Sequence, residues 1–294
     1  MSTAERASAD ELVARPPLRS LVDDLHERRE RIKLGGGEEK IARQHEQDKL
    51  TARERLALLI DEGTFVELGI HGRPHFSQRA MEGKDAPADG VVTGYGKVDG
   101  RLVAVAAYDF TVMAGSMGMT GELKMARLRE MALQKRMPLI WLLDSAGARI
   151  QEAAGSLFAG SGHLFREEVV MSGVVPQVAA LMGPCAAGTA YIPGLADFVP
   201  MVKGRGSMAL AGPHLTKAVT GEDVTQEELG GSKVHTRISG VGDLEVGSDE
   251  ECIQAIKDYV SFFPENCEQQ PPKREPADPI DRMDEELLDV LPDS

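Results

Sequence analysis

The sequence predicts an α/β fold in which helices pack over a largely parallel sheet. Uninterrupted apolar runs indicate buried strands at 138–143 and 177–182, and apolar residues at helical spacing indicate helices at 119–135 and 156–171. Strands that are apolar along their length are typical of a sheet covered on both faces. A helix between consecutive strands is typical of parallel pairing.

The amino-terminal part is predicted to begin with two helices. Residues 17–34 place apolar side chains at helical spacing among charges until the three glycines at 35–37, which predicts a surface helix or an arm that contacts a partner. Thr51 is followed by Glu54 three residues later, the pattern of a capping box. A second helix is therefore expected to begin after Thr51.

Strands and turns are expected from residue 64 to residue 110. The pair Asp99 and Gly100 predicts a hairpin turn, and residues 71–89 are expected to form an irregular loop. The strands expected in this region are 65–68, 90–98 and 102–108.

The remaining chain is expected to add short elements and a tail. These elements are strands at 198–202 and 207–210, small helices within 213–229 and a last helix at 249–263. We divide the chain into an amino-terminal arm with a charged helix (1–37), one α/β domain (38–264) and an acidic, flexible tail (265–294).

Composition excludes several classes of protein. The formal net charge of -14, with no long basic stripe, argues against nucleic acid as the main partner. No apolar run approaches the roughly 20 residues that cross a bilayer, and no secretory signal opens the chain, so we expect a soluble, cytoplasmic protein. Three widely spaced cysteines predict neither a disulfide framework nor a metal site, and Cys185 is expected to be a buried free thiol rather than a nucleophile.

The stretch GPCAAGTAY at 183–191 follows a predicted buried strand and consists almost entirely of small residues. Small residues let the backbone approach a ligand, and free NH groups at the start of a helix can hold an anionic oxygen, such as that of a thioester carbonyl. The alternative is a tight crossing of helix and strand that merely tolerates small side chains.

Two further loops follow predicted strands. Residues 144–152 (DSAGARIQE) lie at the carboxyl end of a strand, where ligand sites of α/β proteins gather, and residues 110–118 (FTVMAGSMG) precede a helix. Arg149 could meet a phosphate or form a structural ion pair. Asp144 and Glu152 could act as an acid and base, although salt-bridged carboxylates are the commoner case. The P-loop pattern is absent, which argues against a nucleoside triphosphatase.

Residues 28–264 resemble the amino-terminal half of the β subunits of biotin-dependent acyl-CoA carboxylases, such as the propionyl-CoA and methylcrotonyl-CoA enzymes. The stretches that carry the resemblance are ARQHEQDKLTARERLALLIDEGTFVELG (42–69), DSAGARIQE (144–152), GPCAAGTAYIPGLADFVPMV (183–202) and AVTGEDVTQEELGGSKVHTRISGVGD (218–243).

The resemblance implies a crotonase-like fold that binds an acyl-CoA and stabilises its enolate with two adjacent backbone NH groups. The family pattern CAGGAVY places these catalytic donors at Ala187 and Gly188, whereas the spelling CTAGGAY places them at Gly188 and Thr189. Where the family usually has two glycines this chain has one, which could tune the acyl group or weaken the site. The substrate-binding residues expected around the donors are Gly115, Ser116, Ala146, Gly147, Ala148 and Arg149.

The resemblance also implies cofactors and partners. Biotin would be attached to a separate carrier protein and carboxylated by a biotin carboxylase subunit. Coenzyme A would be part of the substrate, and no metal is expected. A second carboxyltransferase subunit or domain is expected to supply the biotin site, because the family has a second crotonase-like domain beyond the region of resemblance. The candidates for binding the phosphates of coenzyme A are Lys124, Arg127, Arg149, Lys203 and Arg205.

Two alternatives remain open. The chain could be a biotin-free enzyme of the crotonase or malonate-decarboxylase type, for which Glu152 is the candidate acid or base. It could instead be a catalytically silent subunit that assembles or regulates an active carboxyltransferase.

Overall fold

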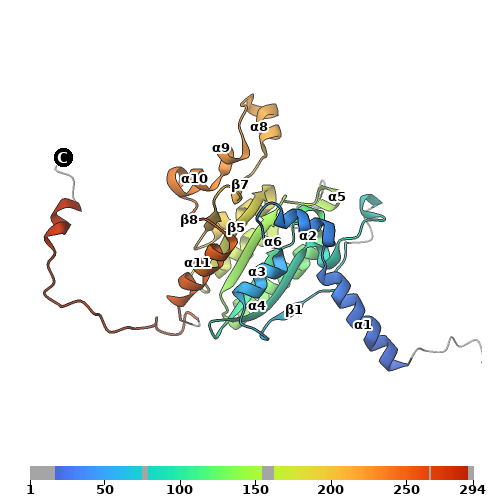
Figure 1. Ribbon diagram of the computed structural model, residues 1–294, viewed down its shortest axis with the longest axis horizontal. Helices are drawn as coiled ribbons and strands as arrows, with labels where there is room; N and C mark the ends of the chain where they lie inside the picture. The colour runs from blue at the N-terminus through green and yellow to red at the C-terminus, as the bar shows by residue number, and fades with distance from the viewer. Residues whose placement is uncertain (1–16, 75–78, 154–161, 265, 291–294) are drawn as a thin grey trace, which may run out of the picture.

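The computed structural model describes residues 17–74, 79–153, 162–264 and 266–290. A mixed sheet of eight strands forms the centre of this part of the chain (Figure 1). The strands are β1 (Val66–Leu68), β2 (Val91–Val98), β3 (Arg101–Tyr108), β4 (Leu139–Ser145), β5 (Gln177–Ala186), β6 (Pro200–Val202), β7 (Ser207–Ala209) and β8 (Leu244–Val246). Their order is β1-β2-β3-β4-β5-β6-β8, and β7 pairs with β5 beside this path.

Strand directions agree with the prediction of a largely parallel sheet. β1, β2 and β3 form an antiparallel meander, and every pair from β3 to β8, including β5 with β7, is parallel. Asp99 and Gly100 have φ angles of +49° and +82°, as expected of the predicted hairpin turn between β2 and β3.

Helices surround the sheet. They are α1 (Leu18–Lys33), α2 (Glu38–His45), α3 (Ala52–Leu59), α4 (Met119–Lys135), α5 (Ile150–Ala153), α6 (Gly162–Met171), α7 (Tyr191–Leu195), α8 (Pro213–Thr220), α9 (Gln226–Gly230), α10 (Ser232–Val234) and α11 (Asp249–Ser261). Short helical turns add η2 (Arg79–Met81), η3 (Pro87–Gly90), η4 (Met113–Gly115), η6 (Ala187–Ala190), η7 (His235–Ser239) and η8 (Glu285–Val290).

Two apolar layers cover the sheet. Trp141 of β4 packs in one layer with residues of α4, α6 and α7, and Leu142 packs in the other with residues of α3 and α11. Because side chains alternate along a strand, a strand between two helical layers is apolar on both faces. Every residue of β4 is buried, which confirms the interpretation of this run from the sequence.

Most predicted elements are present, and the exceptions are short. Helix 119–135 is confirmed with its predicted ends, and Thr51 and Glu54 make both halves of the capping box before α3. The strand predicted at 177–182 continues to residue 186. The predicted helix 156–171 corresponds to α6, which begins at residue 162, and residues 156–161 of the prediction lie outside the described residues.

Two segments project from the sheet and its helices (Figure 1). Helix α1 extends outward from its carboxyl end, where Ile32 packs against Ile70 and Ala88. The acidic segment after α11 runs away from the other side and carries η8. Within the residues that the structure describes, no helix combines the length and apolar character needed to span a bilayer.

Candidate functional site

Two loops meet at the carboxyl ends of β4 and β5. The loop after β4 contains Gly147, whose φ of +95° favours glycine. A Cβ atom on Gly147 would lie 2.5 Å from the carbonyl oxygen of Ala186 and 3.2 Å from the Cβ atom of Ala187. The loop after β4 therefore lies directly against the segment that follows β5, so two of the predicted site stretches are brought together.

The turn η6 begins at this contact, with Ala187 and Gly188 as its first two residues. The first NH groups of a helix have no partner within it. Local bonds fix the turn, because Thr189 Oγ1 donates to the Ala186 carbonyl at 2.9 Å and Cys185 Sγ donates to the Thr189 carbonyl at 3.1 Å. Adjacent donors held in this way can bind an oxygen that gains negative charge.

Ala187 adopts an unusual backbone conformation. Its φ angle of +50° lies in the left-handed region, where a residue with a Cβ atom is about 1–2 kcal/mol less stable than glycine. The backbone at Ala187 therefore has a conformation that glycine favours, and its methyl group makes that conformation more costly.

A third loop, which contains η4, supports the loop after β4. Gly115 has a φ of +61°, and a Cβ atom there would lie 2.2 Å from the carbonyl oxygen of Asp144. Ser145 Oγ donates to the Gly115 carbonyl at 2.7 Å. Only glycine allows this close approach at residue 115, so the predicted loops 110–118 and 144–152 form one packed frame.

Backbone hydrogen bonds lock this frame. The NH group of Ala146 donates to the Ala114 carbonyl at 2.9 Å, and that of Arg149 donates to the Met117 carbonyl at 2.9 Å. The NH group of Gly147 donates to Ser145 Oγ at 3.1 Å. These NH groups have partners inside the protein and are not free to bind a ligand. The next residue, Ala148, forms an isolated parallel bridge with Met117.

Arg149 lies within the frame, 1 % exposed. All five of its NH bonds find acceptors in the chain: Ser116 Oγ, the carbonyls of Ser116 and Asp89, and the carboxylates of Asp89 and Glu152. Burial raises the pKa of Asp89, although the Arg149 charge opposes that shift. These contacts match the structural ion pair, one of the two alternatives that the sequence left for Arg149.

Glu152 and Asp144 lie in separate ion-pair clusters. Glu152 pairs with Arg149 at 3.2 Å and accepts a hydrogen bond from the NH group of Met119 at the start of α4. Asp144 is fully buried and accepts from Lys49, Gln44 and Arg55 instead. The two carboxylates do not form the joint acid and base pair considered from the sequence.

The cluster around Asp144 joins the amino-terminal helices to β4. Gln44 and Lys49 each donate to Asp144 at 2.8 Å, and Arg55 bridges Asp144 and Asp249 at 3.0 and 2.7 Å. Burial disfavours the charge of Arg55, yet the two aspartates hold its pKa above the ordinary value. Burial lowers the pKa of Lys49. Sequence reasoning did not identify Gln44 or Lys49.

The basic candidates for binding phosphates differ in their surroundings. Lys124 donates to the carbonyls of Ala88 and Val91, and burial lowers its pKa to about 8. Arg127 pairs with Glu130 on the surface, and Lys203 is exposed.

Arg205 borders a polar cavity of about 570 Å³ beside the end of β5. The lining of that cavity is Gln47, Lys49, Pro184, Gly204, Arg205, Ser207, Thr225, Gln226 and Glu227.

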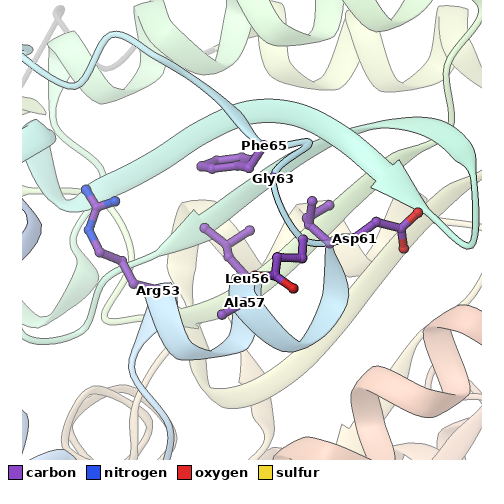
Figure 2. A pocket seen from close by; sticks show the side chains of 8 residues that line it. Arg53, Leu56, Ala57, Asp61, Gly63 and Phe65 are labelled. Atoms are coloured by element: carbon purple, nitrogen blue, oxygen red, sulfur yellow. The ribbon is translucent and has the colours of Figure 1, made fainter.

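A separate groove of about 440 Å³ lies over α3 (Figure 2). Leu56, Ala57 and Phe65 line its apolar part, with Arg53 at one end and Asp61 at the other. Arg53 is bonded through both terminal nitrogens to Glu67, at 2.9 and 3.0 Å. None of its lining residues belongs to the loops after β4 and β5, so this groove is not part of the candidate site.

Comparison with known proteins supports the resemblance. A family model described as carboxyl transferase domain matches residues 43–294. A propionyl-CoA carboxylase carboxyltransferase subunit of Haloferax mediterranei is 45% identical over 92% of this chain and 52% of its own length. A methylmalonyl-CoA decarboxylase subunit alpha of Veillonella parvula is 43% identical over 93% of this chain and 53% of its own length.

Solved structures show the same fold. Transcarboxylase 12S, with methylmalonyl-coenzyme A and methylmalonic acid bound, superposes with a TM-score of 0.87 at 41% identity, over 95% of this chain and 54% of that one. The crotonase-like α/β fold predicted from the resemblance is thereby confirmed. The chain spans about half the length of the curated relatives it matches.

Proposed function

Because the chain belongs to the carboxyl transferase domain family, we propose that it binds an acyl-CoA and takes part in transferring a carboxyl group between biotin and the acyl α-carbon. The observation that carries the proposal is the position of the turn η6, which begins with Ala187 and Gly188 at the carboxyl end of β5. The loop after β4 closes against this turn at Gly147. Thr189 is the other donor in the alternative register.

The backbone donors would act on the thioester carbonyl. As the α-carbon loses its proton, negative charge moves to the carbonyl oxygen, and donors fixed in advance stabilise that charge. Each such donor is worth about 100- to 1000-fold in rate. Carboxybiotin on a carrier would supply carbon dioxide and the ureido nitrogen that takes the proton. No side-chain base is needed from this chain, in keeping with the ion pairs of Asp144 and Glu152.

The residues around the donors would bind two parts of the substrate, the acyl group and coenzyme A. Gly115, Ser116, Ala146, Gly147 and Ala148 would border the acyl group with small side chains, while Arg149 holds their loops together. The polar cavity beside Pro184, with Lys49 and Arg205 in its lining, would receive a polar part of coenzyme A. Among the basic candidates, Arg205 is favoured because it lines a cavity that also includes Pro184 of β5, the strand that leads to the donors.

The biotin side of the reaction would need groups beyond those of this chain. A ureido oxygen requires donors of its own, and the relatives extend about as far again as the region they share with this chain. We expect that second half, as a domain or a subunit, to complete the site. The carrier and biotin carboxylase subunits expected from the resemblance would then act as partners.

A second candidate function has support from one relative. The Veillonella parvula protein is a methylmalonyl-CoA decarboxylase subunit, and removal of a carboxyl group passes through the same enolate. The donors at Ala187 and Gly188 would serve both directions of transfer. The partners, and not this site, would therefore determine whether a carboxyl group is added or removed.

Calorimetry with an acyl-CoA analogue tests the enolate site. An analogue that carries an α-nitronate places negative charge where the enolate oxygen would lie. The proposal predicts that it binds at least about 100-fold more tightly than the plain acyl-CoA, because the donors are complementary to the charged state. Equal affinities would contradict an enolate site, and no binding of either would favour a silent assembly subunit.

A further inference from the structure

A cluster of buried polar groups lies behind the candidate site, on the α4 and α6 side of the sheet. Glu168 of α6 is 1 % exposed, and neither carboxyl oxygen has a hydrogen-bond partner among the residues that the structure describes. Within the same residues, Tyr108 Oη, at the end of β3, and Arg129 Nη1, on α4, are also buried without partners. Helices α4 and α6 pack against each other and are joined by the ion pair of Arg129 with Glu167, the residue before Glu168. Tyr108 lies within electrostatic range of Glu168.

The cluster contains more carboxyl groups than cations. Arg129 bonds Glu122 through one nitrogen and Glu167 through another, so its charge is shared by two carboxylates. Glu168 is a third carboxyl group near this guanidinium, and no cation among the described residues is bonded to it. A buried carboxylate without a partner is strongly unfavourable, and such groups take up a proton instead. Burial raises the pKa of Glu168 to about 9, with Glu122 and Glu167 adding to the shift and Arg129 opposing it.

Glu168 is linked to the donors through packing. The next helix, α7, follows η6 directly, and Phe165 of α6 meets Tyr191 of α7 edge to face at 4.7 Å between ring centres. Cys185 of β5, whose thiol bonds the Thr189 carbonyl, lies within electrostatic range of Glu168. The main chain of Glu168 is held by Gln177 of β5, which donates to its carbonyl at 2.9 Å.

We propose that Glu168 is a positioning residue held as a neutral carboxylic acid, and that its proton keeps α6 packed under α7 and the NH donors of Ala187 and Gly188. This role rests on the proposed function of those donors. Ionisation of Glu168 would add a charge that Arg129 cannot neutralise and would loosen α6. The titratable or charged groups that face Glu168 are Tyr108 from β3, Glu122 and Arg129 from α4, Glu167 from α6 and Cys185 from β5, with His163 beside Glu122.

The sign of the pH effect follows from proton binding. The folded protein holds the Glu168 proton up to a higher pH than the unfolded chain does. The stabilisation is complete below the ordinary glutamate pKa and is lost as pH rises toward about 9. Glu168→Gln keeps a neutral group of the same shape and has no proton to lose. The unfolding constant of the wild type, divided by that of Glu168→Gln, should therefore rise by up to about tenfold per pH unit between pH 6 and 9.

Urea unfolding of the full chain between pH 6 and 10 tests whether Glu168 holds a proton in the folded protein. The variants compared with the wild type are Glu168→Gln, Glu168→Ala and the exposed control Glu130→Gln. We expect Glu168→Gln to exceed the wild type in stability by a margin that widens steadily from pH 6 to pH 9. Glu168→Ala should lose stability throughout, and Glu130→Gln should follow the wild type. Parallel wild-type and Glu168→Gln curves would overturn the proposal, as would a Gln variant that fails at pH 6 like the Ala variant.

Amide hydrogen exchange of peptide 183–191 tests the link to the donors without any ligand. At pH 9.5, exchange in this peptide should be faster in the wild type than in Glu168→Gln, and the difference should be smaller at pH 6. Equal exchange at both values would show that Glu168 does not position the donors. Because neither experiment uses an acyl-CoA, failure of the proposed function would appear separately, as a loss of nitronate binding at pH 6.

Discussion

Arg55 donates to Asp144 across 3.0 Å inside the protein, where both side chains are buried. This bond joins α3 to the carboxyl end of β4, immediately before the loop that borders the candidate site. Gly183 of β5 makes room for it, because a Cβ atom there would lie 2.0 Å from Asp144 Oδ1. The amino-terminal helices thus help to hold the site in place.

Asp144→Asn tests the importance of this cluster. The change leaves Lys49 and Arg55 with reduced counter-charge in a buried environment, and breaking a buried ion pair costs about 3–5 kcal/mol. Urea denaturation should show a fall of that size in the free energy of unfolding. Asp223→Asn, which removes the exposed partner of Lys217, serves as the control and should cost less than about 1 kcal/mol. Similar losses for the two variants would contradict the account.

Ala187→Gly tests the backbone conformation of the donor segment. Glycine removes the penalty of the left-handed conformation, about 1–2 kcal/mol, against an entropic cost of about 0.5–1 kcal/mol. We expect thermal unfolding to show a variant at least as stable as the wild type, with carboxyl transfer retained. Ala57→Gly, at an exposed site inside α3, should lose about 1 kcal/mol. Equal losses would show that Ala187 is not strained.

Gly147→Ala tests the contact between the two loops. The new Cβ atom would lie 2.5 Å from the Ala186 carbonyl oxygen, so the loop after β4 must move away from η6. A displacement of about 1 Å at such a site costs on the order of 100-fold in rate. Gly194→Ala is the matched control, because its Cβ atom meets nothing within 4 Å. Steady-state kinetics should show the large loss for Gly147→Ala alone, and equal rates would contradict this role of the contact.

The sequence was most informative where a pattern repeats. Helix 119–135 covers several turns, and its ends were predicted as observed. Helix α2 has eight residues and a single buried side chain, Gln44, and β8 has three residues, so neither repeats a period clearly enough to recognise. Short elements of this kind are stabilised by tertiary contacts, which the local sequence does not reveal.

The candidate site was predicted only in part for a similar reason. Glycine and alanine patterns marked the loops that meet at Gly147 and Ala187. The bond from Gln44 to Asp144, by contrast, joins residues 100 positions apart, and no spacing in the sequence indicates it. The buried position of Glu168 was also hidden, because an acid in an amphipathic helix ordinarily faces water.

Carboxyl transfer by the complex that forms around this chain tests the central claim most directly. The chain is purified with the proteins bound to it and supplied with a biotinylated carrier, ATP, labelled bicarbonate and a panel of acyl-CoAs. The account predicts labelled product that requires both biotin and this chain, and a loss of about 100- to 1000-fold in Gly188→Pro, which lacks one NH donor. Acyl-CoA binding without any transfer, with the same partners present, would contradict it.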